Sequence, residues 1–106
     1  MNYRFMRILV MFDLPMETSA EKRVYREFRK TLIKNGFLML QKSVYCKLSI
    51  NLTKVNSVIN KIKANQPPNG IVQILVITEK QFASMEILVG KINPSITEGD
   101  QGIIII

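Results

Sequence analysis

Asp13 is the residue of this sequence that is best placed for chemistry. It follows an apolar run, Ile8 to Phe12, and Pro15 comes two positions later. Because proline stops strand pairing, the sequence predicts that Asp13 lies at the end of a buried strand. A carboxylate on such a rigid strand end can bind a hard metal ion. An aspartate before a proline also occurs simply as a turn residue, and this second interpretation stays open.

The composition excludes several kinds of catalytic site. The chain contains no histidine and one cysteine, Cys46. It can form neither a Ser-His-Asp triad nor a Cys-His pair, and it offers no histidine to a zinc ion. One cysteine is also too few for a zinc site made of thiolates within one chain. Any catalysis must therefore use carboxylates, hydroxyls, Lys or Arg and a hard metal ion, Mg²⁺ or Mn²⁺.

One Asp13 per chain is too few carboxylates to hold Mg²⁺, which takes six oxygen ligands and keeps several of its waters. Glu21 follows Thr18 by three residues, the spacing of a helix capping box. We expect Glu17 and Glu27 to be solvated. Two copies of Asp13 across a twofold axis would supply two carboxylates, so a metal site at Asp13 requires a symmetric dimer.

Positive charge is concentrated in the first two thirds of the chain. Residues 1–63 hold 13 Lys and Arg against 4 acids, whereas residues 64–106 hold 2 Lys against 4 acids. The chain as a whole carries a formal net charge of +7. This distribution predicts a surface for a polyanion, most simply nucleic acid, on the first two thirds of the protein. The plainer alternative is that the charge only keeps the protein dispersed.

The elements that must position these residues follow the order strand, helix, strand, strand, helix, strand. We expect strands at 4–14, 37–40, 44–48 and 71–77, and helices at 19–35 and 52–64, from apolar periodicity and from the caps Thr18, Gly36 and Asn51. This is the order of an α+β, ferredoxin-like fold, a split βαβ with two helices on one face of a four-stranded antiparallel sheet. Residues 1–78 form this predicted core.

The first helix is predicted to be basic along one side. Helical spacing places Ala20, Val24, Tyr25, Phe28 and Leu32 on one arc. The opposite, basic arc holds six cations, with Ile33 among them: Lys22, Arg23, Arg26, Arg29, Lys30 and Lys34. We select as candidate nucleic-acid-binding residues the cations of the first strand and most of those of this arc: Arg4, Arg7, Arg23, Arg26, Arg29, Lys30 and Lys34.

Residues 79–106 are expected to extend the core and not to belong to it. The sequence predicts an extra strand at Met85 to Val89 and a further strand at Ile103 to Ile106. Because an apolar strand left alone is an exposed edge, we expect this extension to pair with a sheet of a second subunit. The protein is therefore predicted to be a homodimer.

Length and hydropathy place the chain among single-domain globular proteins. It has 106 residues, of which 47% are hydrophobic, enough for a packed core. No apolar run approaches the roughly 20 residues of a membrane span, so we expect no membrane contact. Since Cys46 has no partner for an intramolecular disulfide, a cytoplasmic location is expected.

Two motifs resemble those of a known family. Ile8 to Pro15 resembles the first strand of the CRISPR-associated protein that partners the integrase in spacer acquisition, in which an aromatic residue precedes Asp. Gly36-Phe37 followed by Gln41 to Tyr45 resembles the second motif of that family. The resemblance covers residues 4–78, and Pro15 and the length of the tail are most like members from type II systems. Phe12 departs from the tyrosine that the family often has there, which implies the loss of a hydroxyl near the expected metal.

The resemblance implies a ferredoxin-like symmetric dimer whose C-terminal strand joins the partner's sheet. It implies a dimer that bridges two integrase dimers and contacts a DNA duplex. It also implies an alternative activity, a Mg²⁺-dependent endonuclease acting on single-stranded RNA or double-stranded DNA, with Asp13 as catalytic residue and metal ligand.

The residues favour the scaffold over the nuclease. A nuclease usually needs several carboxylates around its metal ions, and this chain offers one well-placed carboxylate. A scaffold needs a basic surface, a dimer and free sheet edges, all of which the sequence predicts. A third function, a ferredoxin-like module that binds a small ligand, would need a glycine-rich anion loop, and the five glycines are isolated.

Overall fold

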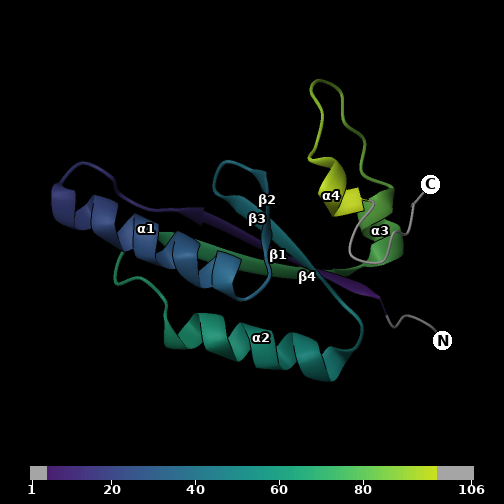
Figure 1. Cartoon of the computed structure of the whole chain (residues 1–106), viewed down its shortest axis with the longest axis horizontal. Coiled ribbons are helices and arrows are strands. Elements are labelled where there is room, and N and C mark those ends of the chain that lie inside the picture. The colour runs from purple at the N-terminus through teal and green to yellow at the C-terminus, as the bar shows by residue number, and fades with distance from the viewer. Residues whose placement is uncertain (1–4, 98–106) are drawn as a thin grey trace.

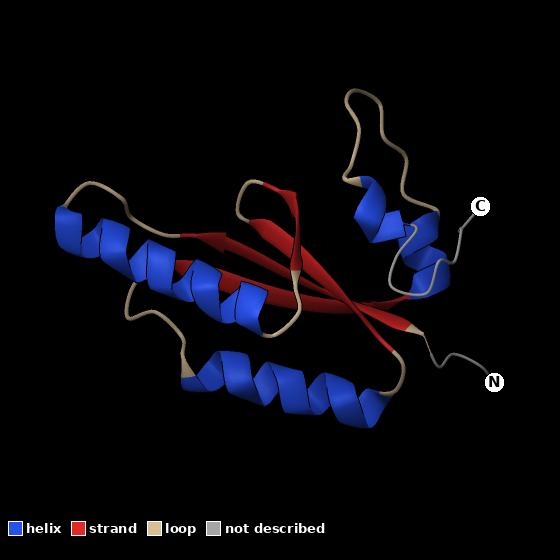
Figure 2. Cartoon of the chain, viewed as in Figure 1, coloured by secondary structure: helices blue, strands red, loops and turns tan. Residues whose placement is uncertain are grey.

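The chain folds into a four-stranded antiparallel sheet with two long helices on one face (Figure 1, Figure 2). The computed structural model describes residues 5–97. The strands are β1 (Met6–Asp13), β2 (Leu38–Gln41), β3 (Val44–Ser49) and β4 (Ile71–Thr78), and they lie in the order β2-β3-β1-β4. The helices are α1 (Ser19–Lys34), α2 (Leu52–Ala64) and the short α3 (Glu79–Ala83) and α4 (Pro94–Thr97). This topology confirms the predicted ferredoxin-like fold.

The ends of α1 are set by local hydrogen bonds. The backbone N–H of Glu21 donates to the Thr18 hydroxyl at 3.0 Å, and the Glu21 carboxylate accepts from the backbone N–H of Thr18 at 3.0 Å. This is the predicted capping box. At the other end Gly36 has a φ of 91° and donates to the carbonyl of Ile33 at 3.0 Å. The left-handed glycine therefore ends the helix one residue earlier than predicted.

The main core lies between the sheet and the helices. Alternate residues of β1 face the helices, and Ile8 and Val10 are fully buried there. The core contains Ile8, Val10, Phe12, Leu14, Phe28, Leu32, Phe37, Tyr45, Val55 and Ile62. β1 lies between β3 and β4, with the two long helices on one of its faces and α3 and α4 on the other, so Arg7 to Val10 are all buried. The predicted buried strand is thus confirmed.

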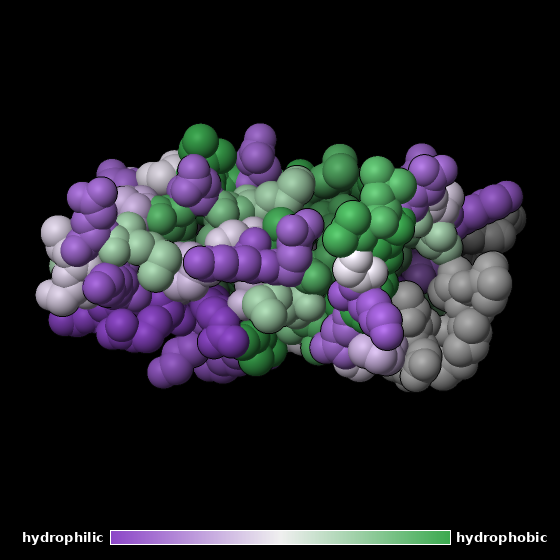
Figure 3. Space-filling model, turned by 90° about the horizontal axis from the view of Figure 1, so that it is seen from above, coloured by the Kyte–Doolittle hydropathy of each residue, from purple (hydrophilic) through white to green (hydrophobic). Residues whose placement is uncertain are grey.

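The other face of the sheet is covered in part by the chain that follows β4. Phe82 of α3 and Ile96 of α4 pack against Leu9 and Cys46 in a second apolar cluster. Seen from above, hydrophilic side chains gather over the end that carries α1, and hydrophobic ones lie nearer the middle, where the loop between α3 and α4 rises (Figure 3).

Residues Met85 to Val89 do not form the predicted strand. They lie in the loop between α3 and α4, beside Leu40 and Gln41 of β2. The apolar pattern was misleading because the Thr78 hydroxyl and Gln81 form a second capping box, which starts α3 directly after β4. Leu88 and Val89 are left 89% and 91% exposed. The second predicted extra strand, Ile103 to Ile106, lies outside the described residues.

Candidate functional site

Asp13 lies at the end of β1 with its side chain exposed, as the sequence predicts. It is paired in register with Ile71 of β4. On the other side of β1, the backbone N–H of Phe12 donates to the carbonyl of Ser43 at 3.0 Å. The Asp13 backbone is therefore fixed between two neighbouring segments, while its carboxylate stays free to bind a ligand.

Gly70 brings the loop between α2 and β4 against this end of β1. A Cβ atom at Gly70 would lie 2.6 Å from the carbonyl oxygen of Asp13 and 2.8 Å from a methyl carbon of Leu14. Its φ of 88° also favours glycine. The contact with Asp13 joins residues far apart in the chain, so no local pattern reveals it.

Phe12 points to the opposite face of the sheet from Asp13. It is buried in the main core, where its ring contacts those of Tyr25, Phe28 and Tyr45 at centroid distances of 5.6, 5.1 and 5.8 Å. Successive residues of a strand face opposite sides of the sheet. The expectation that Phe12 removes a hydroxyl from the neighbourhood of the Asp13 carboxylate is therefore wrong. Phe12 is a core residue.

A single copy of the chain offers few metal ligands around Asp13. Within residues 5–97, no three His, Cys, Asp or Glu side chains come together as a metal site. Glu21 is engaged in the capping box, where its hydrogen bonds with the backbone N–H groups of Thr18 and Glu17 lower the pKa of its carboxyl. Asp13 thus fits a hard metal ion only as one half of a ligand set.

The basic residues of α1 lie together on the surface. Arg23, Arg26, Arg29, Lys30 and Lys34 are all exposed. Arg29 also donates to the hydroxyl of Tyr45 at 2.8 Å, which ties α1 to β3. A second contact, 3.1 Å between the hydroxyls of Tyr25 and Ser43, ties α1 to the turn before β3. The structure therefore brings the predicted basic arc together on a rigid helix. Arg4 lies outside the described residues.

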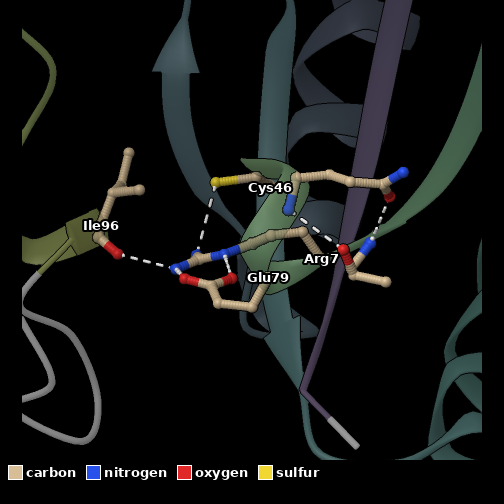
Figure 4. A network of polar contacts seen from close by, with 6 residues as sticks. Arg7, Cys46, Glu79 and Ile96 are labelled. Atoms are coloured by element: carbon tan, nitrogen blue, oxygen red, sulfur yellow. Dashed lines mark hydrogen bonds and ion pairs between the residues drawn. The ribbon is translucent and has the colours of Figure 1, made fainter. Parts of the chain in front are cut away.

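Arg7 is not a surface cation, and its selection as a nucleic-acid-binding residue is wrong. It is 3% exposed and faces the second apolar cluster (Figure 4). Its Nε and Nη2 donate to the two carboxylate oxygens of Glu79 at 2.6 and 2.9 Å, and Nη2 also donates to the carbonyl of Ile96 at 3.0 Å. Its guanidinium lies 4.4 Å from the centre of the Phe82 ring.

The surroundings of Arg7 keep it charged. Burial alone lowers the pKa of the guanidinium, but the hydrogen bonds and the negative charge of Glu79 outweigh it, so the pKa lies above its ordinary value. Glu79 follows Arg7 by 72 residues. A partner so distant in the chain gives no local pattern, which is why the pairing was missed.

Within residues 5–97, none of the helices has the length and apolar character that crossing a membrane requires.

Comparisons with known proteins agree with the strand motifs. The family model described as CRISPR associated protein Cas2 matches residues 6–85. Among similar proteins, the CRISPR-associated endoribonuclease Cas2 of Treponema denticola is 46% identical over 95% of this chain and all of its own length. The proteins of the same name from Streptococcus mutans serotype c and Ligilactobacillus salivarius are 42% and 45% identical, over 93% and 81% of this chain and 91% and 85% of their own lengths. Both the length of these matches and the fold lead to one conclusion: this chain belongs to the Cas2 family of CRISPR-associated proteins.

Proposed function

We propose that this chain acts in spacer acquisition as a homodimeric scaffold that bridges two integrase dimers and contacts the incoming DNA duplex. One observation carries the proposal: Asp13 shares a sheet face with exposed apolar residues. Ile71 is paired in register with Asp13, and Leu75 is paired with Leu9, so all of them point away from α1 and α2. Ile71 and Leu75 remain exposed on this face.

An exposed apolar face of this kind favours pairing with a second copy. Burying apolar side chains stabilises association by roughly 25 cal/mol for each Å² of apolar surface removed from water. The loop between α3 and α4, which lies beside β2 at the other edge of the sheet, also exposes Met85, Ile87, Leu88 and Val89. A twofold axis through this face would place Asp13 opposite Asp13 of the partner subunit, and it would leave the basic arc of α1 accessible on the other side.

The division of the surface suits a scaffold. Ile71 and Leu75 lie on the sheet face, and the exposed cations of α1 lie on the helix layer. Dimerisation and binding of a polyanion therefore make use of different surfaces and do not compete. We place the protein in the cytoplasm, because the sequence has one cysteine, Cys46, and so builds no disulfide within the chain.

The scaffold is tested by reconstitution with the integrase. We expect the purified chain to co-purify with the integrase, and integration of a labelled duplex into repeat DNA to require both proteins. Integration that proceeds equally without this chain would contradict the proposal.

A second candidate function is a metal-dependent endoribonuclease, which the names of the relatives favour. Asp13 and Asp13 of the partner subunit would then hold Mg²⁺ or Mn²⁺. Such an ion, when bound, polarises a phosphate and lowers the pKa of a bound water.

Asp13→Asn separates the two functions because it keeps the shape of the side chain and removes its charge. We expect it to abolish any Mg²⁺-dependent cleavage of single-stranded RNA and of duplex DNA, and to leave dimerisation and integration within about twofold of the unmodified chain. Glu27→Gln, which neutralises an exposed acid of α1, is the matched control and should change neither activity. Loss of integration by Asp13→Asn, with the dimer intact, would rank the catalytic function above the scaffold.

A further inference from the structure

A groove on the helix layer is lined by lysines. It lies between the C-terminal end of α1, the end of β3 and the first turns of α2, and it has a volume of about 760 Å³. Four lysines from three elements line it: Lys34, Lys47, Lys54 and Lys61. The described residues that line it include no acid. Only Lys34 belongs to the basic arc expected from the sequence, so the groove is a separate feature.

The charge of these lysines is not neutralised within the described chain. The ion pair found in residues 5–97 joins Arg7 to Glu79, and none of the four lysines has a carboxylate within salt-bridge distance there. Four uncompensated cations around one concave surface repel one another, which disfavours the folded state. An anionic ligand removes this repulsion.

The position of Lys54 is unfavourable for the helix that carries it. Lys54 lies in the first turn of α2, which contains no acidic residue. A cation there is repelled by the positive end of the helix dipole, whereas Lys34 in the last turn of α1 is favoured. An anion in the groove would offset this unfavourable interaction of Lys54 with the helix dipole.

Gly36 lets one ammonium group lie close to the backbone. A Cβ atom at Gly36 would lie 2.6 Å from Nζ of Lys47, and the φ of Gly36 is 91°. The absence of a side chain at Gly36 therefore leaves room for Lys47 at the mouth of the groove, next to the end of α1.

The chemistry of the lining identifies the ligand. Lysines bind phosphates as point charges, and they are depleted from protein–protein interfaces. The described lining contains no aromatic ring on which the bases of a single strand could stack. We propose that this lysine groove binds the phosphate backbone of duplex nucleic acid, without reading its sequence and without Asp13. This inference rests on the proposed contact with duplex DNA and assigns a surface to it.

The test compares two variants of equal charge. In the groove variant, Lys34, Lys47, Lys54 and Lys61 are changed to Gln. In the control variant, four exposed lysines that lie neither in the groove nor on the basic arc of α1, Lys42, Lys63, Lys80 and Lys91, are changed to Gln. Binding of a fluorescent 30-base-pair DNA duplex is measured by anisotropy over a range of KCl concentrations, and circular dichroism checks that each variant is folded.

We expect the groove variant to bind at least about tenfold more weakly than the control variant. The plot of the logarithm of the association constant against the logarithm of the salt concentration should become shallower. Its slope should decrease in magnitude by about 0.9 for each lost phosphate contact, or by about 3.6 when all four lysines contribute. A double variant changes only Lys54 and Lys61, both exposed on α2, to Gln. Its decrease in slope should be about half that of the fourfold variant, and it replaces the fourfold variant in the test if that one does not fold.

Three results would overturn the inference, and they are distinguishable. Equal loss in the groove and control variants would show that only net charge matters, and it would leave the proposed scaffold intact. No binding of the duplex by the unmodified chain would overturn the groove and the proposed DNA contact together. Normal duplex binding by a groove variant that no longer co-purifies with the integrase would assign the groove to a protein partner.

Discussion

Arg7 joins three segments of the molecule that lie far apart in the chain. Its guanidinium bonds Glu79 at the start of α3 and the carbonyl of Ile96 in α4, and it contacts the Phe82 ring. We expect Glu79→Gln to lower the free energy of unfolding by about 2–4 kcal/mol, because it leaves a buried cation without its counter-charge. Urea denaturation measures this difference. Glu86→Gln, an exposed loop acid, should change it by less than about 0.5 kcal/mol, and equal values for the two variants would contradict this role of the pair.

Substitution of Gly70 shows how closely the segments around Asp13 are packed. Gly70 and Gly90 have φ values of 88° and 94°, so an alanine is strained at both, by about 1–2 kcal/mol. Only at Gly70 does a Cβ meet other atoms, since nothing lies within 4 Å of the Cβ position at Gly90. We expect Gly70→Ala to reduce the free energy of unfolding by at least about 1 kcal/mol more than Gly90→Ala. Equal losses would mean that the loop simply shifts away from Asp13.

For single residues, the sequence predicts the place of a side chain within its strand or helix better than it predicts which distant side chains it contacts. The exposed carboxylate at the end of β1 could be predicted because an apolar run and a proline frame Asp13. The burial of Arg7 could not, since its counter-charge comes from α3, which no pattern placed over the sheet. Phe12 was assigned to the surroundings of Asp13 because the two are adjacent in sequence, but the alternation of a strand sends them to opposite faces.

At the scale of the elements, the N-terminus of α1 depends on an ionised Glu21. The folded state lowers the pKa of this carboxyl from its ordinary value of 4.5, so its contribution to stability is fully present above pH 4.5 and is lost as the pH falls through the lower, folded pKa. We expect Glu21→Gln, whose side chain oxygen still caps the helix, to flatten the fall of the melting temperature as the pH is lowered below 4.5. The comparison is made by thermal unfolding followed by circular dichroism. Identical pH profiles for the variant and the unmodified chain would show that other carboxyls cause the loss.

The elements that the sequence predicts correctly are those specified locally. The capping box of α1, the Asn51 cap of α2 and the buried run of β1 each lie within a few residues of one another. Met85 to Val89 has equally strong apolar character, but a strand also needs a neighbour with free hydrogen-bonding groups. In the described chain these residues lie beside the edge strand β2 as a loop and do not pair with it.

At the scale of the whole molecule, the two layers of the fold have different chemistry. The helix layer carries the exposed cations of α1 and the lysine groove, whereas the opposite sheet face carries Asp13, Ile71 and Leu75. This separation follows from the alternation of the strands and the periodicity of the helices, both of which can be predicted from sequence. The depth of the groove could not be predicted, because Lys34, Lys47 and Lys54 come from three elements whose packing is not local.

The proposed dimer predicts different effects for two apolar side chains of similar exposure. Leu75 on the sheet face is 49% exposed and Ile33 on α1 is 47% exposed. Leu75→Lys should dissociate the dimer, because it places two like charges in a desolvated interface, whereas Ile33→Lys should leave the dimer intact. Sedimentation at micromolar concentration should give about 12.2 kDa for Leu75→Lys and about twice this mass for Ile33→Lys and the unmodified chain. Both variants replace exposed side chains, so both should stay folded by circular dichroism. A dimer that survives Leu75→Lys but not Ile33→Lys would place the interface on the helix layer, where it would cover the basic arc and exclude the proposed duplex.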